Sequence, residues 1–340
     1  MKNYFSGPGW KGDSMNKLRL QLLKLLHENK GRYISGEKMS IELGVSRTAI
    51  WKHIKELREK GYEIDSRSNC GYALIAVTDE IVPEEIYLNL KAGNLGQEIK
   101  YFNRVVSTNK KAKIMAVEDE KDGTIVIAEE QTAGKGRLGR KWYSPPGTGL
   151  WFSLLLRPNF KPEKAPLLTV VASLAVADTL EKYGIKPAIK WPNDILINGK
   201  KVCGILSEMS ADLDKINYAI IGIGINVAQK DFPDFLTEIA TSLFMATGVK
   251  VNRNKLLQQI IYSFNSYYHL LLTDKTHKLI DSWQKRLNVI NKTIEIKSKG
   301  KLYRGKAIGV SEKGELLLEY KNRIISFWAG DATLIKRKNK

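Results

Sequence analysis

A run of glycines and cations between Glu129 and Trp142 is the part of this 340-residue chain whose residue types point most directly to chemistry. Glycine lets a ligand approach the main chain, and backbone amides together with Arg and Lys form a concave anion site. Apolar, strand-like runs precede and follow the segment. We therefore predict a mobile cationic loop between two strands that grips a phosphate-bearing intermediate; the alternative is a solvated basic hairpin. The alternating residues are Gly134, Lys135, Gly136, Arg137, Gly139, Arg140 and Lys141.

Two familiar phosphate motifs fail on context. The segment from Gly134 to Gly139 matches G-x-G-x-x-G, but a dinucleotide fold needs a helix to begin there and an acidic residue about 20 positions later. Here the segment runs into Pro145, Pro146 and Gly147 instead. A P-loop needs Lys and then Ser or Thr after its last glycine, and the chain has two cations there. The anion site must be of another kind.

Three more stretches carry polar groups that a plain apolar core would avoid. Lys190-Trp-Pro-Asn-Asp194 places a cation, an amide and a carboxylate at a strand end. Lys201 follows the Asn198–Gly199 pair, a strong hairpin-turn signal. Gly222-Ile-Gly-Ile-Asn226 puts two glycines inside an apolar strand, which marks a close approach of a ligand or another chain to the backbone.

Strands and helices alternate between residues 101 and 246, which predicts an α+β domain that presents these stretches. We assign this domain to residues 84–285 and expect it to end in two amphipathic helices, Leu256–Asp274 and Lys278–Arg286. Residues 288–337 contain short strands separated by turn signals and predict a small β-barrel. The strands expected in the domain are Tyr101–Val106, Ile125–Glu129, Trp151–Leu156, Ala188–Trp191, Ile195–Ile197, Val202–Glu208 and Tyr218–Asn226, and the helices are Lys110–Asp119 and Leu167–Tyr183.

Residues 15–77 have the layout of a winged helix-turn-helix, although an ordinary three-helix packing module would share it. We expect helices at 16–29, 36–43 and 47–60, and then a β-hairpin, Tyr62–Ile75. The third helix would enter the major groove of DNA, because the start of a recognition helix contacts base edges. Residues 1–14 are expected to be a disordered extension, and Thr78–Glu85 a linker. The expected DNA-binding residues are Ser46, Arg47, Thr48, Trp51 and Lys52.

Composition narrows the class of protein. The net charge of +19 favours polyanionic partners, although the C-terminal end is more basic than the expected DNA-binding head. No apolar run is as long as a membrane span, and no secretory signal is evident. The two cysteines and four histidines show no metal-ligand or triad spacing. We therefore expect a cytoplasmic protein with no metal site made by the protein alone.

Taken together, the motifs resemble the family of bifunctional biotin protein ligases and biotin operon repressors over about residues 15–337. The family usually has Gly-Arg-Gly-Arg in its loop, and Lys135 replaces the first arginine here, which keeps the charge but loses the bidentate fork. The stretches that carry the resemblance are Ser107-Thr108-Asn109, Gln131–Arg137, Lys190–Asp194, Lys201 with Gly204, and Gly222–Asn226.

The resemblance implies an α+β fold with a winged helix-turn-helix, a central mixed-sheet ligase domain like that of class II synthetases, and an SH3-like C-terminal barrel. It also implies a two-step reaction in which biotin and ATP with Mg²⁺ form biotinyl-5′-AMP, and a lysine amine then takes the biotin. Lys201 and Arg137 would be catalytic, and Asp194 would orient the incoming lysine. Biotin would be bound by Ser107, Thr108, Asn109, Gln131, Lys135, Gly136, Arg137, Lys201 and Gly222. ATP or the adenylate would be bound by Arg137, Arg140, Trp142, Lys190, Asn193 and Asn226.

The implied partners are the biotin carboxyl carrier protein of acetyl-CoA or pyruvate carboxylase, operator DNA, and a second copy of the chain when biotinyl-5′-AMP, the corepressor, is bound. No membrane partner is expected. Three rivals remain: a lipoate or octanoate ligase, a non-catalytic ligand-sensing transcription factor, and a monofunctional biotin ligase. The helix-turn-helix argues against the first and third, and the retained Lys201 and Arg137 argue against the second.

Overall fold

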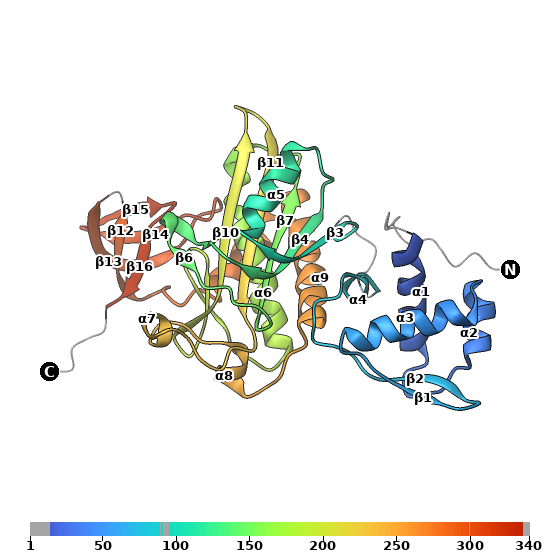
Figure 1. Ribbon diagram of the computed structural model, residues 1–340. Coiled ribbons are helices and arrows are strands. Elements are labelled where there is room, and N and C mark those ends of the chain that lie inside the picture. The colour runs from blue at the N-terminus through green and yellow to red at the C-terminus, as the bar shows by residue number, and fades with distance from the viewer. Residues whose placement is uncertain (1–13, 89, 91–94, 299, 336–340) are drawn as a thin grey trace.

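The computed structural model describes residues 14–88, 90, 95–298 and 300–335. A helical head, a large central part and a small C-terminal β-sheet follow one another along the molecule (Figure 1). The expected extension at 1–14 lies outside the described residues except for Ser14, which begins the first helix. None of the described helices is long and apolar enough to cross a membrane.

The head is a winged helix-turn-helix, as predicted. The Ser35 hydroxyl accepts a hydrogen bond from the Lys38 amide at 3.1 Å, and the Ser46 hydroxyl accepts one from Ala49 at 3.2 Å, so both serines cap the helices that follow them. Gly44 takes the left-handed conformation needed for the turn between these helices, with φ 68°. The elements are α1 (Ser14–Glu28), α2 (Gly36–Leu43), α3 (Arg47–Glu59) and the hairpin β1 (Glu63–Arg67) and β2 (Gly71–Ala76).

A short helix, α4 (Pro83–Leu88), occupies part of the segment that was expected to be a linker, so that prediction was wrong from residue 83 onward. Proline is favoured in the first turn of a helix, and the two glutamates that follow it suit the positive end of the helix dipole. These glutamates are buried, Glu84 to 2% exposure. Glu84 pairs with Arg19, and Glu85 Oε2 lies 2.9 Å from His27 Nε2.

Residues at the start of α9 (Arg253–Leu272) bond to the segment that joins the head to the central part. Asn252 Nδ2 donates to the Thr78 carbonyl at 2.7 Å, and the Val82 backbone amide donates to Asn254 Oδ1 at 3.0 Å. Figure 1 shows α4 between the head and α9. The Arg19–Glu84 ion pair and these hydrogen bonds therefore fix the head against the rest of the chain.

The central part is built on a seven-stranded mixed sheet, which confirms the α+β class. The strand order is β3-β4-β7-β11-β10-β9-β8, in which only β3 and β4 are parallel. Its β9–β10 hairpin turns at Asn198 and Gly199, as the sequence predicted, with φ 50° and 81°. The strands are β3 (Ile99–Val105), β4 (Thr124–Gln131), β7 (Gly149–Leu156), β8 (Ala188–Lys190), β9 (Asp194–Ile197), β10 (Lys200–Ala211) and β11 (Ile216–Asn226).

Helices cover the two faces of this sheet unequally. One face packs against α6 (Leu167–Lys182), behind which lie α9 and α10 (Thr276–Gln284). The other face carries α5 (Thr108–Val117), which covers β4, β7 and β11. Because α5 is short, the same face has room for a cavity beyond its N-terminus. Shorter helical segments are η2 (Pro162–Lys164), α7 (Asp234–Thr237) and α8 (Leu243–Thr247).

The C-terminal residues form five short antiparallel strands, as expected for the predicted barrel. They make one sheet in the order β15-β14-β13-β12-β16. The segment that leads into this sheet is tied to the central sheet, because the Asn288 amide donates to the Ile189 carbonyl at 3.0 Å and the Ile189 amide donates to the Arg286 carbonyl at 2.9 Å. The strands are β12 (Thr293–Ser298), β13 (Lys301–Val310), β14 (Leu316–Tyr320), β15 (Arg323–Phe327) and β16 (Asp331–Leu334).

Candidate active site

A cavity of about 530 Å³ lies on the α5 face of the central sheet. It is bounded by the start of α5, the glycine-rich segment, the β9–β10 hairpin and the edge of the C-terminal sheet. Every ligand-binding residue predicted from the sequence lines it, from five separate segments of the chain. These residues are Ser107, Thr108, Asn109, Gln131, Lys135, Gly136, Arg137, Arg140, Trp142, Lys190, Asn193, Lys201, Gly222 and Asn226.

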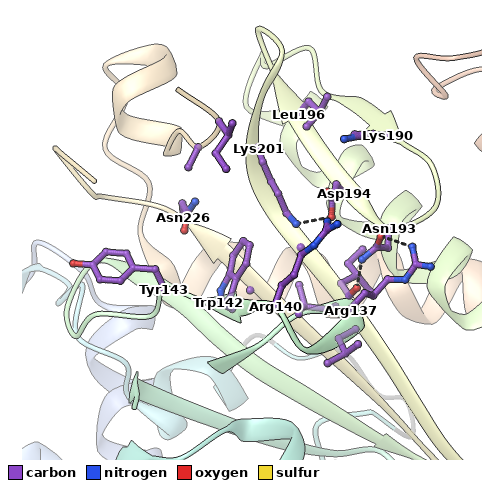
Figure 2. Close-up of a pocket in the computed structure, with 18 of the residues that line it drawn as sticks. Arg137, Arg140, Trp142, Tyr143, Lys190, Asn193, Asp194, Leu196, Lys201 and Asn226 are labelled. Atoms are coloured by element: carbon purple, nitrogen blue, oxygen red, sulfur yellow. Dashed lines mark hydrogen bonds and ion pairs between the residues drawn. The ribbon is translucent and has the colours of Figure 1, made fainter. Parts of the chain in front are cut away.

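The cationic segment is a small hairpin over this cavity. Strand β5 (Gly134–Lys135) pairs with β6 (Lys141–Trp142), and η1 (Arg137–Gly139) forms the tip. The Gly136 amide donates to the Arg140 carbonyl at 2.7 Å, and the Gln131 amide to the Ser144 carbonyl at 3.2 Å, so bonds at the tip and at the base hold the hairpin together. The hairpin directs the side chains of Arg137 and Arg140 into the cavity (Figure 2).

Positive groups converge on the polar strand end formed by Asn193 and Asp194. Arg137 Nη1 donates to Asn193 Oδ1 at 3.2 Å, and Lys201 Nζ lies 2.7 Å from Asp194 Oδ1. In Figure 2 the side chains of Arg140 and Lys201 both extend toward Asp194. Cations gathered around one carboxylate leave an excess of positive charge, which suits an anionic ligand.

Glycines make room for Trp142 against the sheet. Gly204 of β10 lies directly opposite Gly224 of β11. A Cβ atom on Gly224 would lie 2.3 Å from Trp142 Nε1, and one on Gly204 would lie 3.0 Å from the same ring. Lys201 Nζ is 5.1 Å from the centre of that ring, within the range of a cation–π contact. The close approach to the backbone of β11 that its glycines predicted is therefore made at Gly224 by Trp142, a side chain of the same chain.

A hydrogen-bonded group of side chains forms the end of the cavity at the start of α5. Gln131 Oε1 accepts from the Thr108 amide at 2.8 Å and lies 3.1 Å from Thr108 Oγ1. Gln131 Nε2 donates to Ser144 Oγ at 2.9 Å, and Ser153 Oγ lies 2.8 Å from Thr108 Oγ1. Sequence reasoning missed Ser144 and Ser153, because a single serine beside a proline or inside an apolar strand carries no pattern.

Asn109 and Asn226, both predicted as ligand contacts, bond within the chain. Asn109 Nδ2 donates to Glu208 Oε2 at 2.7 Å, and its Oδ1 takes the space that a side chain on Gly222 would need. Asn226 Nδ2 donates to the Thr241 carbonyl at 3.0 Å, and its Oδ1 accepts from Gln229 Nε2 at 3.2 Å. Both side chains therefore brace the walls of the cavity in this structure.

The other end of the cavity has walls that the sequence did not predict. Phe232, Leu236 and Ile239 line it from the segment around α7, and residues of β16 and of the segment before β12 close it. The latter come from positions remote in sequence, and no local motif marks them. They are Asn288, Val289, Ala332, Thr333 and Leu334.

The two cysteines take no part in this chemistry. Cys70 is exposed in the hairpin of the head, and Cys203 is buried in β10. Burial raises the pKa of the Cys203 thiol, so it does not supply a thiolate nucleophile.

Comparison with known proteins agrees with this geometry. The biotin/lipoate A/B protein ligase family matches residues 101–226, and a helix-turn-helix family matches residues 18–73. The bifunctional ligase/repressor BirA of Bacillus subtilis is 42% identical over 93% of this chain and 98% of its own length. That of Escherichia coli is 30% identical over 96% of this chain and 99% of its own length. The chain belongs to the family of bifunctional ligase/repressors.

A solved member of the wider ligase group is similar in structure to most of this chain. The biotin protein ligase of Aquifex aeolicus, solved in complex with biotin and ATP, is 30% identical with a TM-score of 0.62. The match covers 70% of this chain and 99% of the Aquifex chain. The expected resemblance to bifunctional biotin ligase/repressors is thus confirmed.

The head of this family member presents a polar face between α3 and the β1–β2 hairpin. Ser46 caps α3, and Arg47, Thr48, Trp51 and Lys52 follow it in the first half of the helix. Trp51 is 54% exposed, whereas His53, two residues further on, is buried against the core. A second cavity lies on this face, lined by Arg47, Thr48 and Trp51 of α3 and by wing residues that were not predicted: Ser66, Arg67, Ser68 and Asn69.

Proposed function

We propose that this chain is an ATP-dependent biotin protein ligase and a biotinyl-adenylate-dependent repressor of biotin genes. One observation supports this most strongly: hydrogen-bonding side chains for a small polar head and cations for a carboxylate and phosphates line a single cavity. The matched relatives are named as ligase/repressors over nearly their whole length. The substrates are biotin, ATP and a lysine of a biotin carboxyl carrier domain.

In the first step, an oxygen of the biotin carboxylate attacks the α-phosphorus of ATP, and the bond to the β-phosphate breaks to release pyrophosphate. Both reactants are anions, and two unit charges about 4 Å apart repel by about 4 kcal/mol at an effective dielectric constant of 20. Lys201 and Arg137 offset this repulsion from positions already held by Asp194 and Asn193. Arg140 and Lys190 bind the remaining phosphates.

Magnesium would enter with ATP. Among the residues that the structure describes, no group of three His, Cys, Asp or Glu side chains could hold a metal ion. The phosphates of ATP would therefore hold Mg²⁺, and the ion supplies neutralisation of their charge.

In the second step, the amine of the acceptor lysine attacks the carbonyl carbon of the mixed anhydride, and AMP leaves. Lys201 stabilises the developing oxyanion, and electrostatic stabilisation of this kind is usually the largest catalytic contribution. Asp194 would orient the incoming lysine, and its carboxylate can take up the proton that the lysine nitrogen loses as the amide forms. No covalent intermediate with the enzyme is needed.

Pyrophosphate exchange tests the ligase proposal. The protein is incubated with ATP, labelled pyrophosphate and either biotin or lipoate, and the label entering ATP is measured. We expect exchange that requires biotin. Exchange that proceeds without biotin, or with lipoate alone, would contradict the proposal and favour a lipoate ligase.

We further propose that two adenylate-bound copies pair along β10 and so present two heads to a palindromic operator. Among the described residues, β9 pairs with β10 no further than Gly204, and Asn193 and Asn109 bond to the backbone of Ile205 and Leu206, so the outer edge of β10 beyond Leu206 is available to another strand. Glu208 on this stretch bonds to Asn109 at the cavity, which joins the edge to the ligand site. A cytoplasmic location follows from the need for both ATP and DNA.

Sedimentation of the protein with and without biotin plus ATP tests the pairing. We expect a shift from monomer to dimer only with both ligands, and Met209→Glu, which adds charge to the same edge, should prevent it. A protein that stays monomeric at concentrations that saturate operator DNA would contradict the dimer.

A further inference from the structure

Two buried serines outside the predicted ligand set support the head-group end of the cavity. Ser153 in β7 is 0% exposed and Ser144, just after β6, is 4% exposed. Ser153 bonds to the first turn of α5, whereas Ser144 bonds to Gln131 and to the hairpin above the cavity. Each serine lies behind a side chain that lines the cavity rather than in the cavity wall itself.

The oxygen atoms around Ser153 are short of one proton. Asn109 Nδ2 donates to the Leu206 carbonyl at 3.3 Å and to Glu208 Oε2 at 2.7 Å, which fixes its Oδ1 as the atom facing Ser153. Ser153 Oγ lies 2.7 Å from Asn109 Oδ1 and 2.8 Å from Thr108 Oγ1. Thr108 Oγ1 in turn lies 3.1 Å from the amide oxygen of Gln131. These three oxygen–oxygen contacts share only the two hydroxyl protons of Ser153 and Thr108.

The amide oxygen in that third contact belongs to Gln131, whose orientation is fixed from both sides. Its Oε1 accepts from the Thr108 backbone amide at 2.8 Å. Its Nε2 donates to Ser144 Oγ at 2.9 Å, and the single hydroxyl proton of Ser144 goes to the Trp142 carbonyl at 3.2 Å. Gln131 therefore has one amide proton left to donate to a ligand. The neighbouring oxygen atoms lack a proton and would accept one from the same ligand.

We propose that Ser153 and Ser144 are positioning residues that set the hydrogen-bond polarity of this end of the cavity. Ser153 creates the proton deficit, so the oxygens of Thr108 and Gln131 favour a ligand with an N–H donor. Ser144 holds the Gln131 amide so that its remaining proton points at a ligand oxygen. A cyclic urea, with N–H groups on either side of a carbonyl, matches both demands, and a dithiolane ring matches neither. This inference rests on the proposed biotin ligase function.

Three ligands that share a pentanoic acid chain test the two serines separately. Dissociation constants are measured by calorimetry for biotin, 2-iminobiotin and lipoate. In 2-iminobiotin an imino N–H replaces the urea oxygen and would face the fixed amide proton of Gln131. The ring of lipoate has no N–H to fill the deficit at Ser153.

Ser144→Ala should lower the preference for biotin over 2-iminobiotin about tenfold, because the Gln131 amide loses a partner that fixes its direction. Ser153→Ala should lower the preference for biotin over lipoate about tenfold, because Thr108 can then donate to Gln131 without a deficit. The KM for ATP should change by less than about twofold in either variant, since polarity at this end does not reach the nucleotide.

Ser173→Ala is the matched control. Ser173 is also 0% exposed, but its hydroxyl donates to the Val170 carbonyl of its own helix, so the variant should change neither preference. A variant that weakens binding of all three ligands equally, or that moves no ratio, would overturn the inference, because loss of packing predicts that result. If Ser153→Ala does not fold, Ser144→Ala decides. Wild-type protein that binds no biotin would instead overturn the proposed function.

Discussion

Substitution of Gly224 by alanine displaces Trp142 by a distance that the structure fixes. The added methyl would lie 2.3 Å from Nε1 of the indole ring. Non-bonded atoms of this kind rest at about 3.5 Å, so one partner must retreat by about 1.2 Å. Gly224 lies in β11, which is paired on both sides, to Trp151 of β7 and Gly204 of β10. Trp142 ends a two-residue strand of the hairpin, and so it is the side chain that moves.

The displacement should damage catalysis far more than stability. Trp142 belongs to the hairpin that carries Arg137 and Arg140, and its ring lies 5.1 Å from Lys201 Nζ. A misplacement of about 1 Å at a reacting centre can cost about a hundredfold in rate. We expect a loss of that order in kcat/KM for biotin transfer. The free energy of unfolding should change by less than about 1 kcal/mol, because alanine also relieves the entropic cost of glycine in a strand.

Initial rates of acceptor biotinylation and urea unfolding curves measure the two effects. Gly36→Ala is the control, since its methyl would meet nothing closer than 3.7 Å and the residue lies in the head. Trp142→Ala should abolish the effect of Gly224→Ala, because the obstacle is gone. A Gly224→Ala enzyme within threefold of the wild-type rate, or one whose loss adds fully to that of Trp142→Ala, would refute the reasoning.

Three further substitutions address the charge in the cavity, the head and the joint. Lys201→Gln should slow biotin-dependent pyrophosphate exchange by about 10²–10³-fold. It should change stability by less than about 1 kcal/mol because its ion pair is partly exposed; a rate within tenfold of wild type would contradict the role. Arg47→Ala should weaken operator binding and make the slope of log affinity against log salt shallower by about 0.9 for each DNA phosphate that the arginine neutralises. Ligation should be unchanged in Arg47→Ala, and slower ligation would count against independent functions. Arg253→Met should destabilise the fold by about 2–3 kcal/mol in a denaturant titration, because the buried guanidinium hydrogen-bonds to Glu129 at 2.7 Å and to the Gly149 carbonyl at 3.2 Å. A destabilisation under about 1 kcal/mol there would show that Glu129 is rehydrated.

Local signals in the sequence predicted local structure well. Ser35 and Ser46 cap helices where expected, and Asn198–Gly199 forms the tight turn, because these conformations depend on neighbouring residues alone. The predicted ligand residues converge on one cavity because each stretch is at the end of a sheet strand, at the start of α5 or on the hairpin above them. Their individual roles remain predictions.

Contacts between distant parts of the chain escaped sequence reasoning. The glycines of β11 signalled a close approach, but the sequence could not show that Asn109 and Trp142 make it. The C-terminal sheet closes one end of the cavity although it carries no ligand motif. Helix α4 was predicted as a linker because its proline indicates a break in regular structure. Its buried glutamates contact α1, which lies more than 50 residues earlier, and no local signal shows that contact.

That acidic turn makes the head a fixed arm. Glu84 holds it to α1 by an ion pair with Arg19 and Glu85 by a hydrogen bond to His27, and α9 holds the segment behind it. If two copies pair along β10, the distance between the recognition helices is set by the packing of the two proteins and not by the DNA. Half-sites on B-DNA recur about every 34–36 Å, and a site with another spacing must twist or bend to fit, at an energy that depends on its sequence. The dimer would then select operators by the spacing of their half-sites. A substitution at the joint between the head and the central part would change the preferred spacing without changing any contact with a base.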